Sequence, residues 1–163
     1  MPIYGKFPGI DGEVTVKNYD KCIELISFSE GASKATSGGA TAALSKAGDT
    51  EVTDCQMSMH VDKALSNFFK QCCSGKHFAS PVEIHFTQTT GAHVETYLKY
   101  TFDNAHISHV HFSGHEPSEH RGIVSLALTF QQIKIKYTEI DPKTGKNKGS
   151  SEFGWDLHLR KEV

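Results

Sequence analysis

Residues 122–159 read GIVSLALTFQQIKIKYTEIDPKTGKNKGSSEFGWDLHL, and this stretch decides the fold. Large apolar side chains occupy the even positions of residues 124–130 and the odd positions of residues 133–137, so the pattern changes parity at residues 131–132. Because side chains alternate between the two faces of a strand, this change moves the buried set to the opposite face unless the strand bulges or passes into another sheet. A strand that bends from one sheet to another is typical of barrels and sandwiches.

The rest of the chain consists of short alternating segments with one helical pattern among them. Apolar residues between Leu65 and Cys72 recur at helical spacing after Asp62, which can cap the helix, and Gly75 is placed to end it. We expect strands at residues 3–7, 22–28, 51–61, 81–89, 94–102, 105–112, 122–140 and 153–159. The pattern predicts an all-β fold with one inserted helix, in a single domain over residues 1–163.

Composition argues against several functional classes. The 163 residues carry a formal net charge of −2, which gives no electrostatic case for nucleic acid or an anionic membrane. The first residues lack the apolar core of a signal peptide, and no run approaches the roughly 18 apolar residues of a membrane-spanning helix. We therefore expect a protein made in the cytoplasm, for which export would use no cleavable signal. The four cysteines fit no zinc or CxxC motif and are expected to be free thiols.

Residues 29–50 are the longest interruption of the strand pattern. They are rich in Gly, Ala, Ser and Thr, with Gly38 and Gly39 at their centre. A loop of roughly 20 residues inside a compact domain is usually functional, or becomes ordered on a partner. The alternative is a surface loop without a role.

Histidine is over-represented, with ten in the chain. Five of them crowd one region: His106, His109, His111, His115 and His120. On a strand His109 and His111 project from the same face, which is a usable arrangement of two metal ligands. A third ligand would come from His115, Glu116 or His120 in the following loop. The alternatives are a pH-sensitive cluster and ordinary surface or interface histidines.

Three common catalytic or nucleotide-binding motifs are missing from the sequence. It contains no GxSxG, no P-loop and no GxGxxG that opens a helix, so we expect neither enzymatic activity nor a cofactor. The remaining functional class is assembly through backbone pairing, because an unprotected edge strand can pair with a strand of another chain. Repeating such a heterologous contact gives a ring when the rotation closes, and long loops can reach between stacked rings.

Five short segments resemble, in this order, the Hcp family, the tube proteins of type VI secretion systems. They are KCIELISFSEG at residues 21–31, Asp62-Lys63 at the start of the helix, CSGKHF at residues 73–78, Ser113-Gly114 before a polar loop, and FGWDL at residues 153–157. The likeness covers most of the chain, and the ordered set is more specific than any one segment.

The resemblance implies a β-barrel built of two packed antiparallel sheets with one α-helix at its side, related to phage tail tube proteins. It implies a single Hcp-like tube domain over residues 1–163 that forms homohexameric rings, which stack into a hollow tube. A contractile sheath surrounds such a tube, a VgrG-type spike caps it, and small effectors can travel in its lumen. The protein would leave the bacterial cytoplasm through the type VI system, without a cleavable signal peptide, cofactor, nucleic acid or membrane insertion.

The resemblance also gives the loop after Phe28 a role in contacts between stacked rings. The residues assigned to this ring-stacking loop are Gly31, Ser33, Gly38, Gly39, Ala43 and Asp49. This chain departs from the family pattern in two places. Phe28 stands near a position where the family often has Trp, and the usually Gly-rich loop at residues 113–121 contains His115, Pro117 and His120.

Three alternatives remain open from the sequence. A phage-type tail tube protein would have the same kind of fold and would assemble through the same kinds of contact. A His-dependent, metal-binding small barrel would use His109 and His111. A barrel that binds a small ligand would need an open interior, whereas this chain has large side chains sufficient to fill one: Phe86, Phe102, Phe130 and Trp155.

Overall fold

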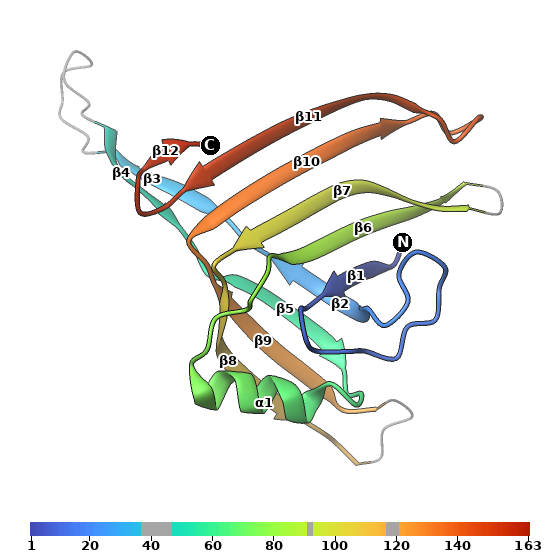
Figure 1. Ribbon diagram of the computed structural model, residues 1–163, viewed down its shortest axis with the longest axis vertical. Helices are drawn as coiled ribbons and strands as arrows, with labels where there is room; N and C mark the ends of the chain where they lie inside the picture. The colour runs from blue at the N-terminus through green and yellow to red at the C-terminus, as the bar shows by residue number, and fades with distance from the viewer. Residues whose placement is uncertain (37–46, 91–92, 117–120) are drawn as a thin grey trace.

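The computed structural model describes residues 1–36, 47–90, 93–116 and 121–163 (Figure 1). Its strands are β1 (Ile3–Lys6), β2 (Ile23–Ser29), β3 (Ala32–Thr36), β4 (Ala47–Val52), β5 (Cys55–His60), β6 (Val82–Thr90), β7 (His93–Asp103), β8 (His106–Ser113), β9 (Ile123–Thr129), β10 (Gln132–Ile140), β11 (Asn147–Asp156) and β12 (Lys161–Glu162). One helix, α1 (Leu65–Ser74), accompanies them in these ranges. The predicted all-β fold with a side helix is confirmed.

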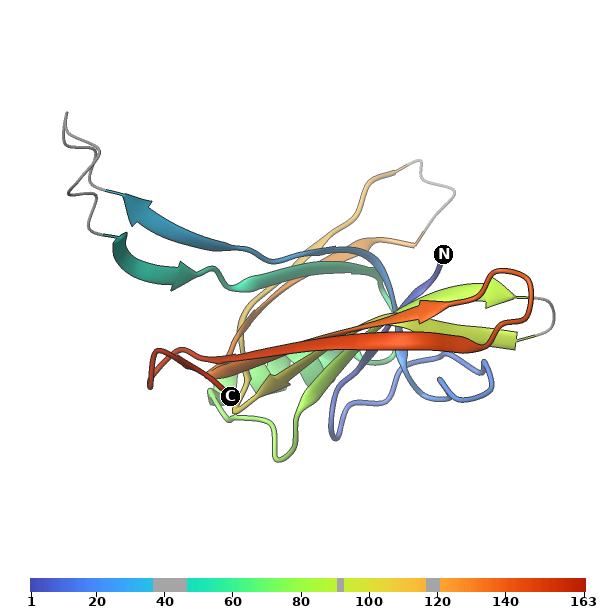
Figure 2. The ribbon, with the colours of Figure 1, turned by 90° about the horizontal axis from the view of Figure 1, so that it is seen from above.

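Ten of the strands form one antiparallel sheet in the order β12-β11-β10-β7-β6-β1-β2-β5-β9-β8. Strand β1 pairs with β2 on one side and with β6 on the other, so it joins the two halves of the sheet. Figure 2 shows these halves as two layers that face each other. The expected pair of packed sheets is therefore one folded sheet, and its two edges, β8 and β12, do not meet within the described residues.

The parity change at residues 131–132 marks the passage of the chain from one layer to the other. Strand β9 pairs with β5 and β8, whereas β10, which begins three residues after β9 ends, pairs with β7 and β11. Leu126 and Leu128 are buried from β9, and Ile133 is buried from β10. The predicted change of sheet position is confirmed, and one continuous strand is replaced by two.

The last predicted strand, at residues 153–159, both begins and ends earlier, because β11 covers Asn147–Asp156. Strand β11 stops at Asp156, whose buried carboxylate accepts hydrogen bonds from the Leu159 amide at 2.8 Å and from Gln132 Nε2 at 2.7 Å. These bonds hold the pKa of Asp156 below its usual range, the Leu159 bond contributing most. The bond to Leu159 turns the chain, and the two-residue strand β12 then returns along β11.

Helix α1 covers one end of the layered sheet and ends where the sequence predicts. The Gly75 amide donates to the carbonyls of Gln71 and Cys72, and Gly75 has φ 61°, a left-handed conformation that glycine adopts without strain. The start of the helix differs from the prediction, because Ala64 is its N-cap residue and no side chain caps it. The predicted cap, Asp62, instead accepts the Ala64 amide with Oδ1 at 2.8 Å, in the turn before the helix. Phe68 is fully buried against Phe7 with a ring-centroid distance of 5.0 Å, which fixes the helix to the core.

The core lies between the two layers and beneath α1. Its largest fully buried apolar side chains come from both layers and from the helix: Phe68, Phe102, Ile23, Met59, Ile84, Ile107, Leu126, Leu128, Val82 and Val124. The four cysteines are free, as predicted, and Cys22 and Cys55 are buried. Burial raises the pKa of the Cys55 thiol, so this side chain packs as a small apolar group.

Candidate assembly surface

The segment expected as a loop at residues 29–50 contains strands β3 and β4, which is a correction to the sequence interpretation. They pair as an antiparallel hairpin in the register Ala32↔Val52, Ser33↔Glu51 and Lys34↔Thr50. The expected strand at residues 51–61 is divided between β4 and β5. The hairpin projects from the molecule in both ribbon views (Figure 1, Figure 2).

The base of the hairpin is closed by hydrogen bonds and packed into the core. The Gly31 carbonyl accepts the Thr53 amide at 2.8 Å and the Thr53 hydroxyl at 3.0 Å. Immediately before the hairpin, the Phe28 ring lies 4.8 Å from that of Tyr100 and 5.3 Å from that of Phe86. These contacts fix the point at which the hairpin leaves the layered sheet.

Glu30 ties the same point to the opposite layer. Burial, followed by the charge and hydrogen bond of Glu30, raises the pKa of Tyr100 to about 12. The phenol is therefore protonated at physiological pH and serves as a hydrogen-bond partner of the carboxylate. The hairpin base thus contacts strand β7 as well as its neighbours in sequence.

The residues assigned to the ring-stacking loop divide into two groups. Gly31 lies at the closed base, Ser33 lies in β3 with an exposed side chain, and Asp49 is a residue of β4. Gly38, Gly39 and Ala43 lie outside the described residues. The described part of the assignment is thus brought together on one projecting hairpin.

An apolar hollow of about 340 Å³ separates the hairpin from strands β10 and β11. Its lining residues are Glu30, Ala32, Lys34, Thr50, Val52, Ile133, Ile135, Phe153 and Trp155. Phe153 is 46% exposed, and its ring stacks on that of Trp155 at a centroid distance of 6.4 Å. This apolar surface continues the core face of β10 and β11 beyond the point where the other layer covers it.

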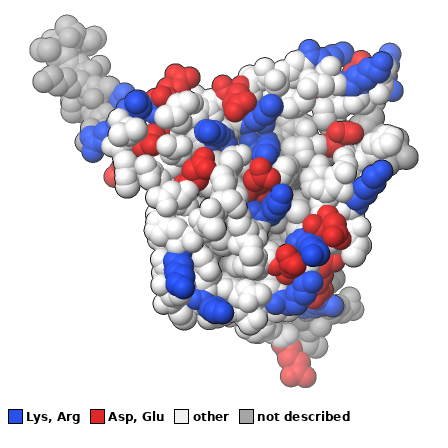
Figure 3. Space-filling model, viewed as in Figure 1, with Lys and Arg blue, Asp and Glu red and all other residues white. Residues whose placement is uncertain are grey.

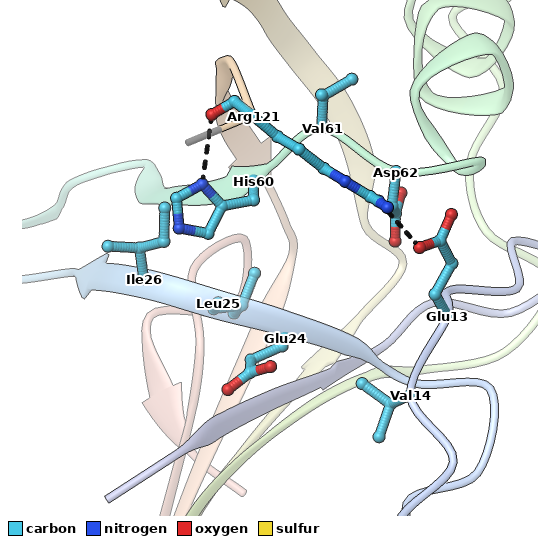
Figure 4. A pocket seen from close by; sticks show the side chains of 9 residues that line it. All are labelled: Glu13, Val14, Glu24, Leu25, Ile26, His60, Val61, Asp62 and Arg121. Atoms are coloured by element: carbon cyan, nitrogen blue, oxygen red, sulfur yellow. Dashed lines mark hydrogen bonds and ion pairs between the residues drawn. The ribbon is translucent and has the colours of Figure 1, made fainter. Parts of the chain in front are cut away.

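A second hollow of about 380 Å³ lies between the N-terminal segment, β2 and the end of β5 (Figure 4). Arg121 reaches across it to Glu13 Oε2 at 3.0 Å, and its carbonyl accepts Nδ1–H of His60 at 3.4 Å. The hydrogen bond from Arg121 holds the pKa of Glu13 below its usual range, whereas burial raises the pKa of Asp62. Glu13 and Arg121 are 108 positions apart, so no local sequence signal could have found this pair.

Two rows of mostly polar side chains cross β2, β5, β9 and β8 on the face that points away from the core. One row is Ser27, Ser58, Ser125 and His111, and the next is Ser29, Gln56, Ala127 and His109. We call these eight residues the serine–histidine face. The hydroxyls of Ser27 and Ser58 are 2.6 Å apart, and a hollow of about 580 Å³ lies over much of this face.

The predicted histidine cluster is only partly assembled. His109 and His111 are exposed on β8, with ring centroids 6.2 Å apart and ring planes within 16° of parallel. His106 lies apart from this pair and packs against His77 at 4.7 Å. Within the described ranges no group of three His, Cys, Asp or Glu residues could hold a metal ion. His115 and Glu116 therefore do not complete a three-ligand site with the pair, and His120 lies outside the described residues.

Charges of both signs are interspersed on the face seen in Figure 3, without a large patch of one sign. Lys99 and Glu83 form an ion pair between β7 and β6, and Lys136 lies 3.9 Å from Glu152 between β10 and β11. In the parts of the chain described by the structure, no helix has the length and apolar character needed to cross a membrane.

Solved structures with the same arrangement come from type VI secretion systems. One described as a type six secretion system protein superposes with a TM-score of 0.91 over 99% of both chains, at 21% identity. Hcp1 from Salmonella typhimurium matches with a TM-score of 0.79 at 27% identity, over 99% of this chain and 98% of that one. Hcp2 from the same organism matches with a TM-score of 0.70 at 27% identity, over 98% of both chains. No curated protein sequence matches this chain.

The open antiparallel sheet with its projecting hairpin is thus the fold of a type VI secretion system protein. The family model described as "Type VI secretion system effector, Hcp" matches residues 4–137. The chain belongs to the Hcp family and is a type VI secretion tube subunit.

Proposed function

We propose that this chain assembles into homohexameric rings that stack into a hollow tube, which contraction of a surrounding sheath expels. Membership of the Hcp family is the observation that carries this proposal. The work of such a subunit is mechanical, so contacts between copies replace catalytic chemistry.

The shape of the chain supports assembly through unlike surfaces. An open sheet offers unpaired backbone groups at its edges, and β8 has eight residues whereas β12 has two. Contacts between two different surfaces are heterologous, and repeating them closes a ring when the rotation per subunit divides a full turn. The half-exposed Phe153 beside Trp155 supplies apolar area suited to such a contact.

We assign the projecting hairpin to contacts between stacked rings. The base of the hairpin is fixed to the core by the contacts of Gly31 and Phe28, so a force on the hairpin is transmitted to the core of the subunit. The assignment includes Gly31, Ser33 and Asp49, together with Gly38, Gly39 and Ala43 of the segment that β3 and β4 enclose.

The remaining partners follow from the same proposal. A VgrG-type spike would cap the tube, the sheath would surround it, and small effectors would travel in its lumen. The chain would be made in the bacterial cytoplasm as a single tube domain over residues 1–163 and leave through the type VI system without a cleavable signal peptide.

The mass of the purified protein tests the ring. Light scattering after size exclusion should give a species near six times the 18.0 kDa of the chain. A clean monomer at all concentrations and salt conditions would contradict self-assembly by the isolated chain.

A shortened hairpin tests the stacking role separately. Replacing residues 37–46 by a two-residue turn should leave the number of chains per ring unchanged and abolish longer stacks in electron micrographs. As a matched control, replacing residues 143–146 in the turn between β10 and β11 should leave stacking intact. Stacks that survive loss of residues 37–46 would contradict the assignment.

A further inference from the structure

His109 and His111 combine exposure with a fixed geometry. Both side chains project from the same face of β8, and their rings are nearly parallel at a centroid distance of 6.2 Å. Ser108, the extra residue of the bulge that precedes His109, donates its hydroxyl to the Ala127 carbonyl at 3.2 Å. The backbone that carries the pair is therefore anchored to β9 by a side chain as well as by the strand ladder.

The surroundings of the pair suit a cation. The other six residues of the serine–histidine face are Ser, Gln or Ala, so none brings a positive charge beside the imidazoles. Asp54 lines the hollow over the same face, and its negatively charged carboxylate favours a cation there. Exposure leaves room for water to fill the remaining coordination positions of a metal ion.

We propose that His109 and His111 form a two-histidine chelate for borderline divalent transition metals, namely Cu²⁺, Ni²⁺ and Zn²⁺. Neutral imidazole nitrogens are ligands that these ions prefer. Two imidazoles on one tetrahedral zinc ion place their ring centres about 5 Å apart, because each Zn–N bond is about 2.0–2.1 Å long. The observed 6.2 Å reaches that separation through small rotations of two exposed side chains.

The other close histidine pair does not offer the same chemistry. His77 and His106 have ring centroids only 4.7 Å apart, but Nδ1 of His77 already bonds to Asn104 Oδ1 at 2.8 Å. Nδ1 of His106 is buried without a partner among the described atoms, so a hydrated ion cannot reach it. The chelate is therefore assigned to His109 and His111 and not to His77 and His106.

Calorimetric titration of the untagged protein with each metal salt tests the site directly. We expect one ion per chain at pH 7.5, bound more tightly as Cu²⁺ than as Ni²⁺ or Zn²⁺, in line with the general order for nitrogen ligands. Binding should weaken in acid, because a protonated imidazole cannot ligate.

Paired variants separate this chelate from the other histidines. The double variant His109→Asn/His111→Asn should bind the metal at least tenfold more weakly. Each single variant should show most of this loss of affinity, because chelation requires both rings. The matched control His93→Asn/His158→Asn also removes two histidines outside the core, and it should bind metal as the natural chain does. Circular dichroism in the presence of EDTA checks that every variant is folded.

Two outcomes would overturn the proposal. One is equal metal affinity in the two double variants, which would assign binding to other groups. The other is binding by the natural chain no tighter than by a single exposed histidine. Either result concerns β8 alone and leaves the ring and tube proposal to its own mass measurement.

Discussion

Replacing Phe68 by Ala should cost the protein a large share of its stability. Phe68 is the only residue of α1 that is fully buried, and its ring meets the edge of the Phe7 ring at 5.0 Å and 88°. The substitution removes the apolar transfer energy of the ring and leaves a cavity that the strands around it cannot collapse to fill.

The expected loss is about 3–5 kcal/mol, the range observed when a buried Phe is truncated to Ala. The aromatic contact with Phe7 contributes about 0.5–1.5 kcal/mol of this total. Natural domains have about 5–15 kcal/mol of stability in all, so the variant should fold but with a much lower midpoint. For a chain of this size each kcal/mol lowers the melting temperature by about 2–4 °C.

Urea unfolding followed by circular dichroism measures the change, at one protein concentration because assembly also stabilises a fold. The matched control is Phe69→Ala on the same helix, since Phe69 is 42% exposed and should lose about 1 kcal/mol or less. Equal losses for the two variants, or a loss below about 1.5 kcal/mol for Phe68→Ala, would refute the packing argument. Phe68→Leu keeps part of the volume and should fall between them.

Three further changes test other parts of the fold. Gly75→Ala should destabilise the chain by about 1 kcal/mol in urea unfolding, because φ 61° strains any side chain although the space around it is open. Gly122→Ala should cost about 1–3 kcal/mol, since its new methyl would lie 2.8 Å from the Ser113 carbonyl oxygen; stability equal to the natural chain would contradict this. Burial lowers the pKa of His85 below its ordinary 6.5, although the charge of Glu83 acts in the opposite direction. The native state therefore binds the proton at a lower pH than the unfolded chain does. Stability should therefore be complete above pH 6.5 and fall as the pH drops through the folded pKa, and His85→Gln should flatten this part of a urea-midpoint profile against pH.

The parity change at residues 131–132 is predictable from the sequence because side-chain alternation is a local property. The same property predicts that His109 and His111 share one face of a strand. The helix end at Gly75 is likewise predictable, because a left-handed residue after an apolar helical stripe has a local cause.

The hairpin is not predictable in this way because its stabilising contacts are not local. Its Gly, Ala, Ser and Thr residues show no alternation of apolar and polar side chains, which is the usual signal of a strand. Its position depends on Phe28, Glu30 and Tyr100, which join segments about 70 residues apart in sequence. Whether a sheet closes also depends on all of its strands together, so local patterns could not distinguish a closed barrel from the open sheet.

The candidate site is predictable only in part, for the same reason. Gly31, Ser33 and Asp49 are expected near one another because they are close in sequence, whereas the apolar hollow between the hairpin and β11 requires the folded chain. Phe153 and Trp155 give the signal of an ordinary strand, and only their incomplete cover in the structure identifies them as candidate contact residues.

The eight residues of the serine–histidine face carry no Lys, Arg, Asp or Glu side chain, so they do not favour a ligand of one charge over a ligand of the other. Hydroxyl and amide groups exchange hydrogen bonds with water at small net cost, and none of the eight side chains is an ammonium, a guanidinium or a carboxylate. The eight residues therefore give an acidic and a basic polypeptide no fixed charge to distinguish them, and the charged residue that lines the hollow over them is Asp54. A ligand that lies against these eight side chains is therefore selected by its size and its hydrogen-bonding groups, and a metal ion held by the two imidazoles would add a charge to the face.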